Sequence, residues 1–236
     1  AQRSGGPEVN ISVGGAVGNS RIDAAGNATL AGATSNNANN GVAVDAVGVA
    51  TTTAVQNLQL TSAAVSSLTG QEGALLTNKD GVQVVLGGAS IVGSQVTVDG
   101  NSAGGSATGN AAANRIDVKG NTIALANGLP LAGATSVGGI AGAVADHALS
   151  NIQLVTSPTI SSKVAAAFGV DTAPGAVIAG STLSASNNTQ SAKAVANTGS
   201  NAIALAATDV SARSALMSSQ GSAAAVEARS FMQAFA

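Results

Sequence analysis

The chain has 236 residues, of which 8% are charged and 1% aromatic, with a net charge of −2 and no cysteine. This composition argues against nucleic-acid binding, because Lys and Arg are few and scattered, and it excludes disulfide frameworks and thiolate zinc sites. Large side chains are too scarce to fill a thick globular interior, yet 45% apolar residues are too many for a disordered chain. The composition therefore favours a folded protein with a thin core of Ala, Val, Ile and Leu.

One pattern occurs three times along the chain, in copies of about 9–80, 81–174 and 175–221. The copies open on related stretches, VGGAV at Val13–Val17, LGGAS at Leu86–Ser90 and PGAVI at Pro174–Ile178. A serine and an alternating apolar pair follow, then three asparagines at intervals of nine and four, then a second apolar pair. The equivalent asparagines are Asn27, Asn36 and Asn40, Asn101, Asn110 and Asn114, and Asn188, Asn197 and Asn201.

The two apolar pairs of each copy are separated by 20 residues: Ile22 and Val42, Val96 and Ile116, Leu183 and Ile203. Within a pair the period is two, and the residues between are rich in Gly, Asn, Ser and Thr, which disfavour helix interiors. This spacing predicts an all-β fold, a parallel β-solenoid with coils of roughly 20 residues and strands about 4.8 Å apart. Residues 1–221 are expected to form this single solenoid.

Asparagines that stack in such a solenoid can form an amide ladder, in which each side-chain N–H donates to the next carbonyl along the stack. Asn also tolerates left-handed corners, and the pairs Gly26-Asn27, Gly100-Asn101 and Asn187-Asn188 follow the first strand of each copy. The ladder is our interpretation of the nine asparagines. The alternative is that they are separate, solvated turn residues.

Copy two is longer than copy one between two corresponding stretches, QNLQL at Gln56–Leu60 and SNIQL at Ser150–Leu154. From Val42 to Leu58 there are 16 residues, whereas from Ile116 to Ile152 there are 36. The difference of 20 predicts one inserted coil, made from the segment around Thr122–Gly142.

The segment 222–236 departs from the pattern. Ala224, Ala228, Phe231 and Phe235 fall on one stripe of a short amphipathic helix. Such a helix could cap the last coil or dock on a neighbouring subunit. The residues predicted for this cap or assembly role are Val226, Phe231, Met232 and Phe235.

Catalytic and metal-binding residues are few. His147, beside Asp146, is interpreted as a solvated loop histidine, and the scattered acids do not occupy equivalent positions as a β-helix glycosidase would need. No enzyme activity, metal or cofactor is expected. No uninterrupted apolar run of about 18 residues occurs, so no membrane span is expected.

The low charge, the Ala, Gly, Ser, Asn and Val content and the regular asparagines resemble secreted bacterial surface-fibre proteins. These are the functional amyloids of curli and pseudomonad biofilms and the holdfast anchors of stalked alphaproteobacteria. Curli-type repeats pair a glutamine with the asparagine, whereas here Gln190 corresponds to Thr29 and Ala103. The resemblance implies export across an outer membrane, assembly into a fibre, and a role in adhesion or biofilm matrix.

A chain with so few ionised groups cannot cover its surface with charge, and open solenoid ends can satisfy each other by head-to-tail addition. We therefore expect the structural subunit of an extracellular bacterial fibre, with itself as the main partner and an outer-membrane anchor or secretion pore as a further one. The first residues, AQRSGG, fit a mature secreted product. The alternatives are a monomeric or anchored adhesin stalk and a β-helix carbohydrate-active enzyme.

Overall fold

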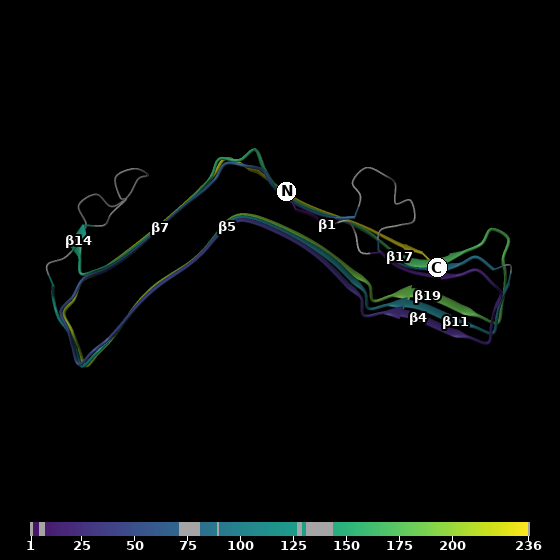
Figure 1. Ribbon diagram of the computed structural model, residues 1–236, viewed down its shortest axis with the longest axis horizontal. Coiled ribbons are helices and arrows are strands. Elements are labelled where there is room, and N and C mark those ends of the chain that lie inside the picture. Colours follow the sequence, from purple (N-terminus) through teal and green to yellow (C-terminus); the bar gives the residue numbers. More distant parts are fainter. Residues whose placement is uncertain are drawn as a thin grey trace.

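The structure is a computed structural model that describes residues 2–4, 8–70, 81–88, 90–126, 129–130 and 144–235. Within these ranges the chain forms 23 β-strands and no helix. The strands wind into three rungs stacked on one another, and each rung is a long, flattened loop with two facing walls (Figure 1). The predicted all-β, parallel β-solenoid fold is confirmed.

Each rung repeats the same order of strands. The first rung contains β2 (Glu8–Val13), β3 (Val17–Gly18), β4 (Arg21–Ala25), β5 (Ala28–Asp45), β6 (Gly48–Val49), β7 (Thr53–Thr61) and β8 (Val65–Thr69). The second contains β9 (Gly81–Leu86), β10 (Ser90–Val92), β11 (Gln95–Asp99), β12 (Ser102–Lys119), β13 (Thr122–Ile123), β16 (His147–Val155) and the first half of β17 (Thr159–Thr172). The third contains the rest of β17, then β18 (Val177–Ala179), β19 (Thr182–Ser186), β20 (Thr189–Ala206), β21 (Asp209–Val210), β22 (Ser214–Ser222) and the first half of β23 (Ala225–Phe235). The second half of β23 pairs with the third-rung part of β17 and so lies one layer beyond it.

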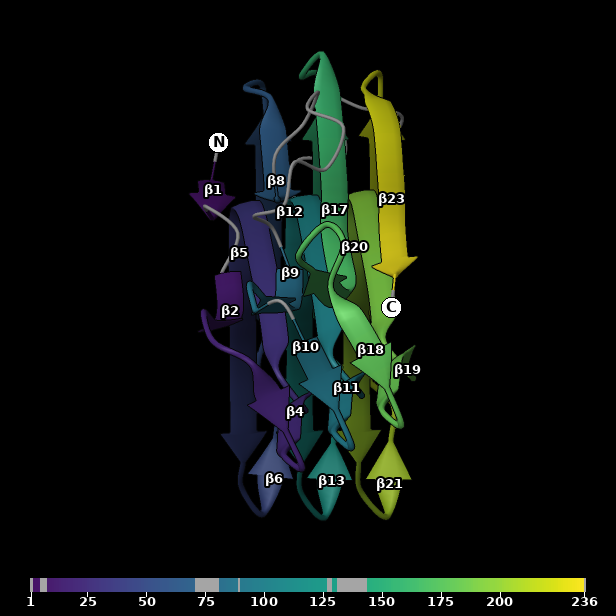
Figure 2. The same ribbon diagram turned by 90° about the vertical axis from the view of Figure 1, so that its right-hand side faces the viewer.

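Corresponding strands of the three rungs pair in parallel and in register. The long strand β12 lies between β5 and β20, so that Ile116 has Val42 on one side and Ile203 on the other. Figure 2 shows these stacks from the side, with β6, β13 and β21 next to one another. The second rung is therefore paired on both sides, whereas the first and third rungs form the two ends of the stack.

The predicted coil length of about 20 residues is wrong. The rung partner of Asn101 is Asn27 on one side and Asn188 on the other, 74 and 87 residues away, so one whole repeat makes one rung. Ile22 and Val42 lie at opposite ends of the same wall, each packed against a different core cluster. The 18-residue strand β5 continues between them, because its interior asparagines bond across to the facing wall instead of forming corners.

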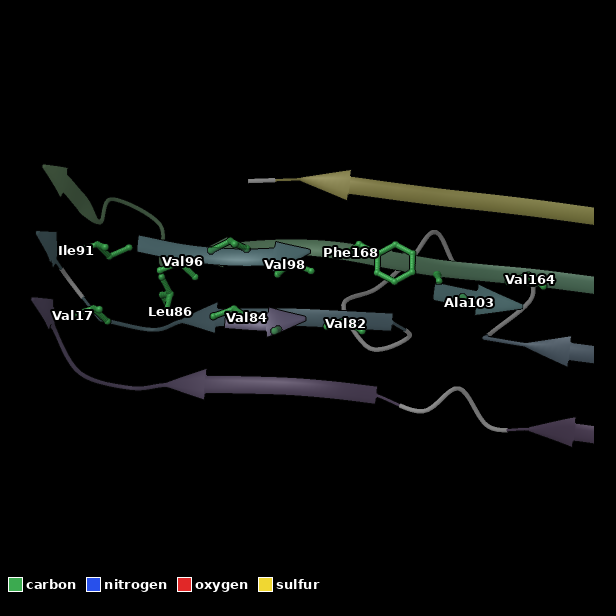
Figure 3. Packing of buried hydrophobic residues seen from close by; sticks show 13 residues of the cluster. Val17, Val82, Val84, Leu86, Ile91, Val96, Val98, Ala103, Val164 and Phe168 are labelled. Carbon is green, nitrogen blue, oxygen red and sulfur yellow. The ribbon is translucent and has the colours of Figure 1, made fainter. Parts of the chain in front are cut away.

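The core is thin and has two apolar ends. At one end Val96 and Val98 of the β4–β5 wall pack against Val84, Leu86 and Phe168 of the facing wall (Figure 3). At the other end the buried residues are Val49, Val55, Ile116, Val118, Ile123 and Leu149. Between them small residues such as Ala107 bring the walls close together, and amide side chains take the place of apolar ones.

The corner between β4 and β5, and its equivalents, uses the left-handed conformation that the sequence predicts there. Gly26, Gly100 and Asn187 have φ of 69°, 62° and 51°. Glycine adopts this φ without strain, and asparagine tolerates it better than other residues do. The three rungs therefore turn at the same place.

The predicted helix in 222–236 is also wrong. Residues Ala225–Phe235 form strand β23, which pairs in parallel with β17 from Thr159 to Gly169. The same segment also alternates with a period of two, and Val226 and Met232 stand in register with the buried Ile160 and Ala166. The segment forms a strand and not a helix because it lies along the edge of β17. A strand there pairs with the backbone N–H and C=O groups of that edge, which a helix would leave unpaired.

The described residues of the predicted inserted coil in copy two do not form a further rung. Strands β13 and β16 on either side of them keep the register of the first and third rungs, while β14 (Leu129–Pro130) pairs antiparallel with β15 (Val144–Ala145). Ala145 packs against Ala148, Ile152 and Met217. The predicted coil lies partly outside the described residues, at 127–128 and 131–143.

Candidate assembly surfaces

The nine asparagines of the sequence pattern lie in three columns along the stack. The first column stands at the corner after β4, where Nδ2 of Asn27 donates to Oδ1 of Asn101, and Nδ2 of Asn101 donates to Oδ1 of Asn188, both at 2.9 Å. The backbone N–H groups of Asn27 and Asn101 donate to the same two oxygens at 3.0 Å. Because a backbone N–H can only donate, these bonds fix which amide atom is the oxygen.

The other two columns lie inside the solenoid, on the long strands β5, β12 and β20. Asn36 donates to Asn110 at 2.7 Å and Asn110 to Asn197 at 2.8 Å. Asn40 donates to Asn114 and Asn114 to Asn201, both at 2.8 Å. All three columns therefore run in the same direction, from the first rung to the third.

The second column also clamps the two walls together. Nδ2 of Asn36, Asn110 and Asn197 donates to backbone carbonyls of the facing wall, at Leu60, Leu154 and Gly221, over 2.9 to 3.1 Å. Asn110 is fully buried. A buried amide must be satisfied to be tolerated, and this one uses both its donor and its acceptor groups.

The facing wall carries a glutamine column that the sequence analysis missed. Nε2 of Gln220 donates to Oε1 of Gln153 at 2.6 Å, and Nε2 of Gln153 donates to Oε1 of Gln59 at 2.7 Å. The matched stretches QNLQL and SNIQL contained the signal, because Gln59 and Gln153 hold the same position in both. This column runs from the third rung to the first, opposite to the asparagines.

The two ends of the stack carry complementary groups. At the first-rung end, Oδ1 of Asn36 accepts no hydrogen bond from the part of the chain that the structure describes. Nε2 of Gln59 donates one N–H to the carbonyl of Ala111, and its second N–H is available to a neighbouring molecule. At the third-rung end Asn197 keeps a second N–H beyond the one donated to Gly221, and Oε1 of Gln220 is an acceptor. Each end thus offers what the other lacks.

Apolar columns are also left open at both ends. Ile116 and Val118 of the middle rung are fully buried, whereas their neighbours in the outer rungs, Val42 and Val44 on one side and Ile203 and Leu205 on the other, are only partly buried. The difference arises only from stacking, since all three rungs face the same interior.

The predicted assembly residues lie on β23, at the third-rung end. Val226 and Met232 stand above the inward-facing column and are 48% and 49% exposed, while Phe231 is 60% exposed on the opposite face. Phe235 pairs by its backbone position with Gly169. The structure thus places all four on one open edge strand.

A buried ionic group, which the sequence did not predict, lies on the facing wall next to β16. The Asp146 carboxylate accepts N–H bonds from the backbone of Arg213 at 2.9 Å and of Ala126 at 3.1 Å, and its pKa is lowered to about 2, chiefly by the Arg213 backbone and then by the guanidinium. His147 is fully buried with Nδ1 2.9 Å from Oγ1 of Thr53, and burial lowers its pKa. The interpretation of His147 as a solvated loop residue is wrong.

The other acids within the described residues are not register partners of one another. Asp23 has Thr97 as its rung partner, and Asp99 has Ala25 and Ser186. Among the described residues no group of three His, Cys, Asp or Glu side chains could hold a metal ion.

The fold and its open ends define the chain as a three-rung parallel β-solenoid. Comparisons with protein-family models, curated proteins and solved structures find no match to it. None of the described segments is a helix long and apolar enough to span a membrane.

Proposed function

We propose that this protein is the subunit of a fibre that grows by head-to-tail stacking of solenoids. The observation that carries the proposal is the complementarity of the two ends. Placing the third rung of one copy under the first rung of the next brings Asn197 N–H groups to Asn36 oxygens and Gln59 N–H groups to Gln220 oxygens. It also continues the apolar column of Val42, Ile116 and Ile203 into the next copy.

Stacking two like ends would not work in this way. First rung against first rung would set Asn36 oxygens against each other, and like acceptors that face each other without donors are costly when buried. Parallel strands also require all rungs to run in the same direction. The contact is therefore heterologous, and such a contact does not close and propagates as a filament.

The place of the fibre follows from the resemblance to secreted surface-fibre proteins and from the low charge of the chain. We extend the proposal to an extracellular fibre of a bacterial surface or biofilm matrix, held by an outer-membrane anchor or secretion pore. An anchored, monomeric stalk shares the fold and differs only in having ends that do not stack.

Two single substitutions test the direction of stacking. Val42→Lys places a charge in the apolar column at the first-rung end, and Ile203→Lys does the same at the third-rung end. Both sites are partly buried at an open end, so a lysine there can reach water in the monomer but not in the stack. We expect the unsubstituted protein to form fibres with rising concentration, and each variant to remain monomeric.

The mixture of the two variants gives the decisive result. Val42→Lys leaves the third-rung end unchanged, and Ile203→Lys leaves the first-rung end unchanged. These two ends can bind each other, so an equimolar mixture should form dimers and no polymer. Analytical ultracentrifugation measures this. Dimers of either variant alone would show that like ends meet. An unsubstituted protein that stays monomeric in electron micrographs would instead support the anchored stalk.

A further inference from the structure

The short strand β1 (Gln2–Ser4) covers part of the first-rung end. It pairs in parallel with β8, so that Gln2 lies beside Ser67, Arg3 beside Leu68 and Ser4 beside Thr69. On its other side β8 pairs with β17, and β17 with β23. The strand β1 therefore stands where the end of a preceding rung would stand.

The register shows which residues of a preceding copy belong at that position. Ser67 pairs with Ser162, and Ser162 pairs with Ala228. When a third rung lies next to a first rung, Ala228 therefore falls beside Ser67 of the next copy, and Arg229 and Ser230 follow. These are the places that Gln2, Arg3 and Ser4 occupy.

The two segments also match in sequence. The stretch Gln2-Arg3-Ser4 shares its arginine and serine, position for position, with Ala228-Arg229-Ser230. The first and second rungs have Ser67-Leu68-Thr69 and Ser162-Lys163-Val164 in the same columns, and these stretches lack the arginine and serine pair. The strand β1 thus resembles the strand whose place it takes.

The overlap continues past β1. Glu8 pairs with Gly81, Gly81 with Ala167, and Ala167 with Gln233. Glu8–Asn10 of one copy and Gln233–Phe235 of the copy before it would therefore occupy the same line. Two backbones cannot both lie there.

We propose that, when copies stack, β23 of one copy replaces β1 and the first three residues of β2 in the next. This inference rests on the head-to-tail stacking proposed above. It makes β1 a removable cover of the first-rung end, one that must leave before the preceding copy can bind.

The exchange favours β23 because of length and composition. The strand β1 has 3 residues, whereas β23 has 11 and can pair with all of Val65–Thr69 and then with Gly81–Gln83. The half-exposed Val226 would join the inward column of Val65 and Ile160. A longer parallel pairing with apolar burial outcompetes a short one.

A disulfide that holds β1 in place tests the exchange. The chain has no cysteine, and Arg3 and Leu68 are register partners. Neighbouring strands lie about 4.8 Å apart, within the span of a disulfide. We expect oxidised Arg3→Cys/Leu68→Cys protein to lose fibre growth and to regain it on reduction. The matched control, Ala111→Cys/Thr198→Cys, links rungs two and three of one copy and should grow fibres in both states.

A second pair of cysteines reports the register of the junction. In one copy Ser66 and Glu227 are both partners of Ser161 and so lie two strand spacings apart, about 10 Å, too far for a disulfide. Across the proposed junction they are direct partners. Oxidised Ser66→Cys/Glu227→Cys fibres should give covalent multimers on a denaturing gel, whereas the shifted pair Ser66→Cys/Arg229→Cys should give few.

The outcomes separate this inference from the proposed function. Fibres of the unsubstituted protein, loss of growth in the locked protein and multimers from the Ser66 and Glu227 pair would support the exchange. If the locked protein grows as well as the control, or the cysteines at Arg3 and Leu68 do not join, the exchange is wrong while head-to-tail stacking stands. If the unsubstituted protein forms no fibres, the proposed function itself is wrong.

Discussion

Asn101 donates two hydrogen bonds to one atom, Oδ1 of Asn188, from its backbone N–H at 3.0 Å and from its Nδ2 at 2.9 Å. The same pair of bonds joins Asn27 to Asn101. An asparagine column therefore couples the backbone of one rung to the side chain of the next. It sets both the register of the stack and its direction, and direction is what an end-to-end contact needs.

The amide at Asn110 should be among the least replaceable in the chain. Asn110→Ala removes the donor to Leu154 and Asn197 and the acceptor of Asn36, so that three partly buried groups lose a hydrogen bond around a fully buried site. We expect a loss of about 2–4 kcal/mol in the free energy of unfolding. Urea denaturation measures it. Asn37→Ala, at an exposed position of β5, is the matched control and should change it little; equal losses would contradict the column's role.

The corner glycine at Gly100 should tolerate asparagine and resist alanine. Its φ is 62°, and a Cβ there would meet nothing within 4 Å, so only the backbone conformation matters. Gly100→Ala should cost about 1–2 kcal/mol, the penalty for an ordinary residue in the left-handed region. Gly100→Asn should cost less, because Asn187 already holds the equivalent corner of the third rung. A thermal melt of both variants compares them, and an equal loss would argue against this reason.

Stability should fall with acidity in two windows. The pKa of His147 lies below 6.5 in the folded protein because of burial, so the unfolded chain binds the proton first and stability drops as the pH falls below 6.5. The pKa of Asp146 is lowered from 3.8 to about 2, so its contribution is present above 3.8 and lost between these values.

Urea midpoints measured from pH 8 downward check this. His147→Gln should remove the first drop and leave the second, which the other lowered carboxylates such as Asp23 and Asp99 share. A first drop that persists in His147→Gln would show that another group titrates there.

The fold class could be predicted because two signals agree. Alternating pairs such as Ile22 and Ala24 have the period of a strand, and Asn27, Asn101 and Asn188 fall at the same place in each copy. Equal spacing in parallel copies is what rung-to-rung pairing requires. The alignment of the copies therefore predicted the parallel β fold. The predicted register, with residues 20 apart on adjacent rungs, is wrong, because the rung partners Asn27, Asn101 and Asn188 are 74 and 87 residues apart.

The size of a rung could not be predicted in the same way. An interval of 20 from Ile22 to Val42 fits a closed coil as well as one long wall, and only the contacts of Asn36 and Asn40 with the facing wall decide. Those contacts join residues far apart in the sequence. Likewise, Ala224, Ala228 and Phe231 fit a helix until the open edge of β17 is known.

The axial repeat of the fibre tests the central claim most directly. Three rungs at the spacing of paired strands, about 4.8 Å, give each subunit a rise of about 14 Å along the fibre. Helical reconstruction from electron micrographs should therefore show strands perpendicular to the axis at that spacing, with one subunit every three strands and all subunits pointing the same way. A fibre in which subunits alternate in direction, or in which the subunit rise is not three strand spacings, would contradict it.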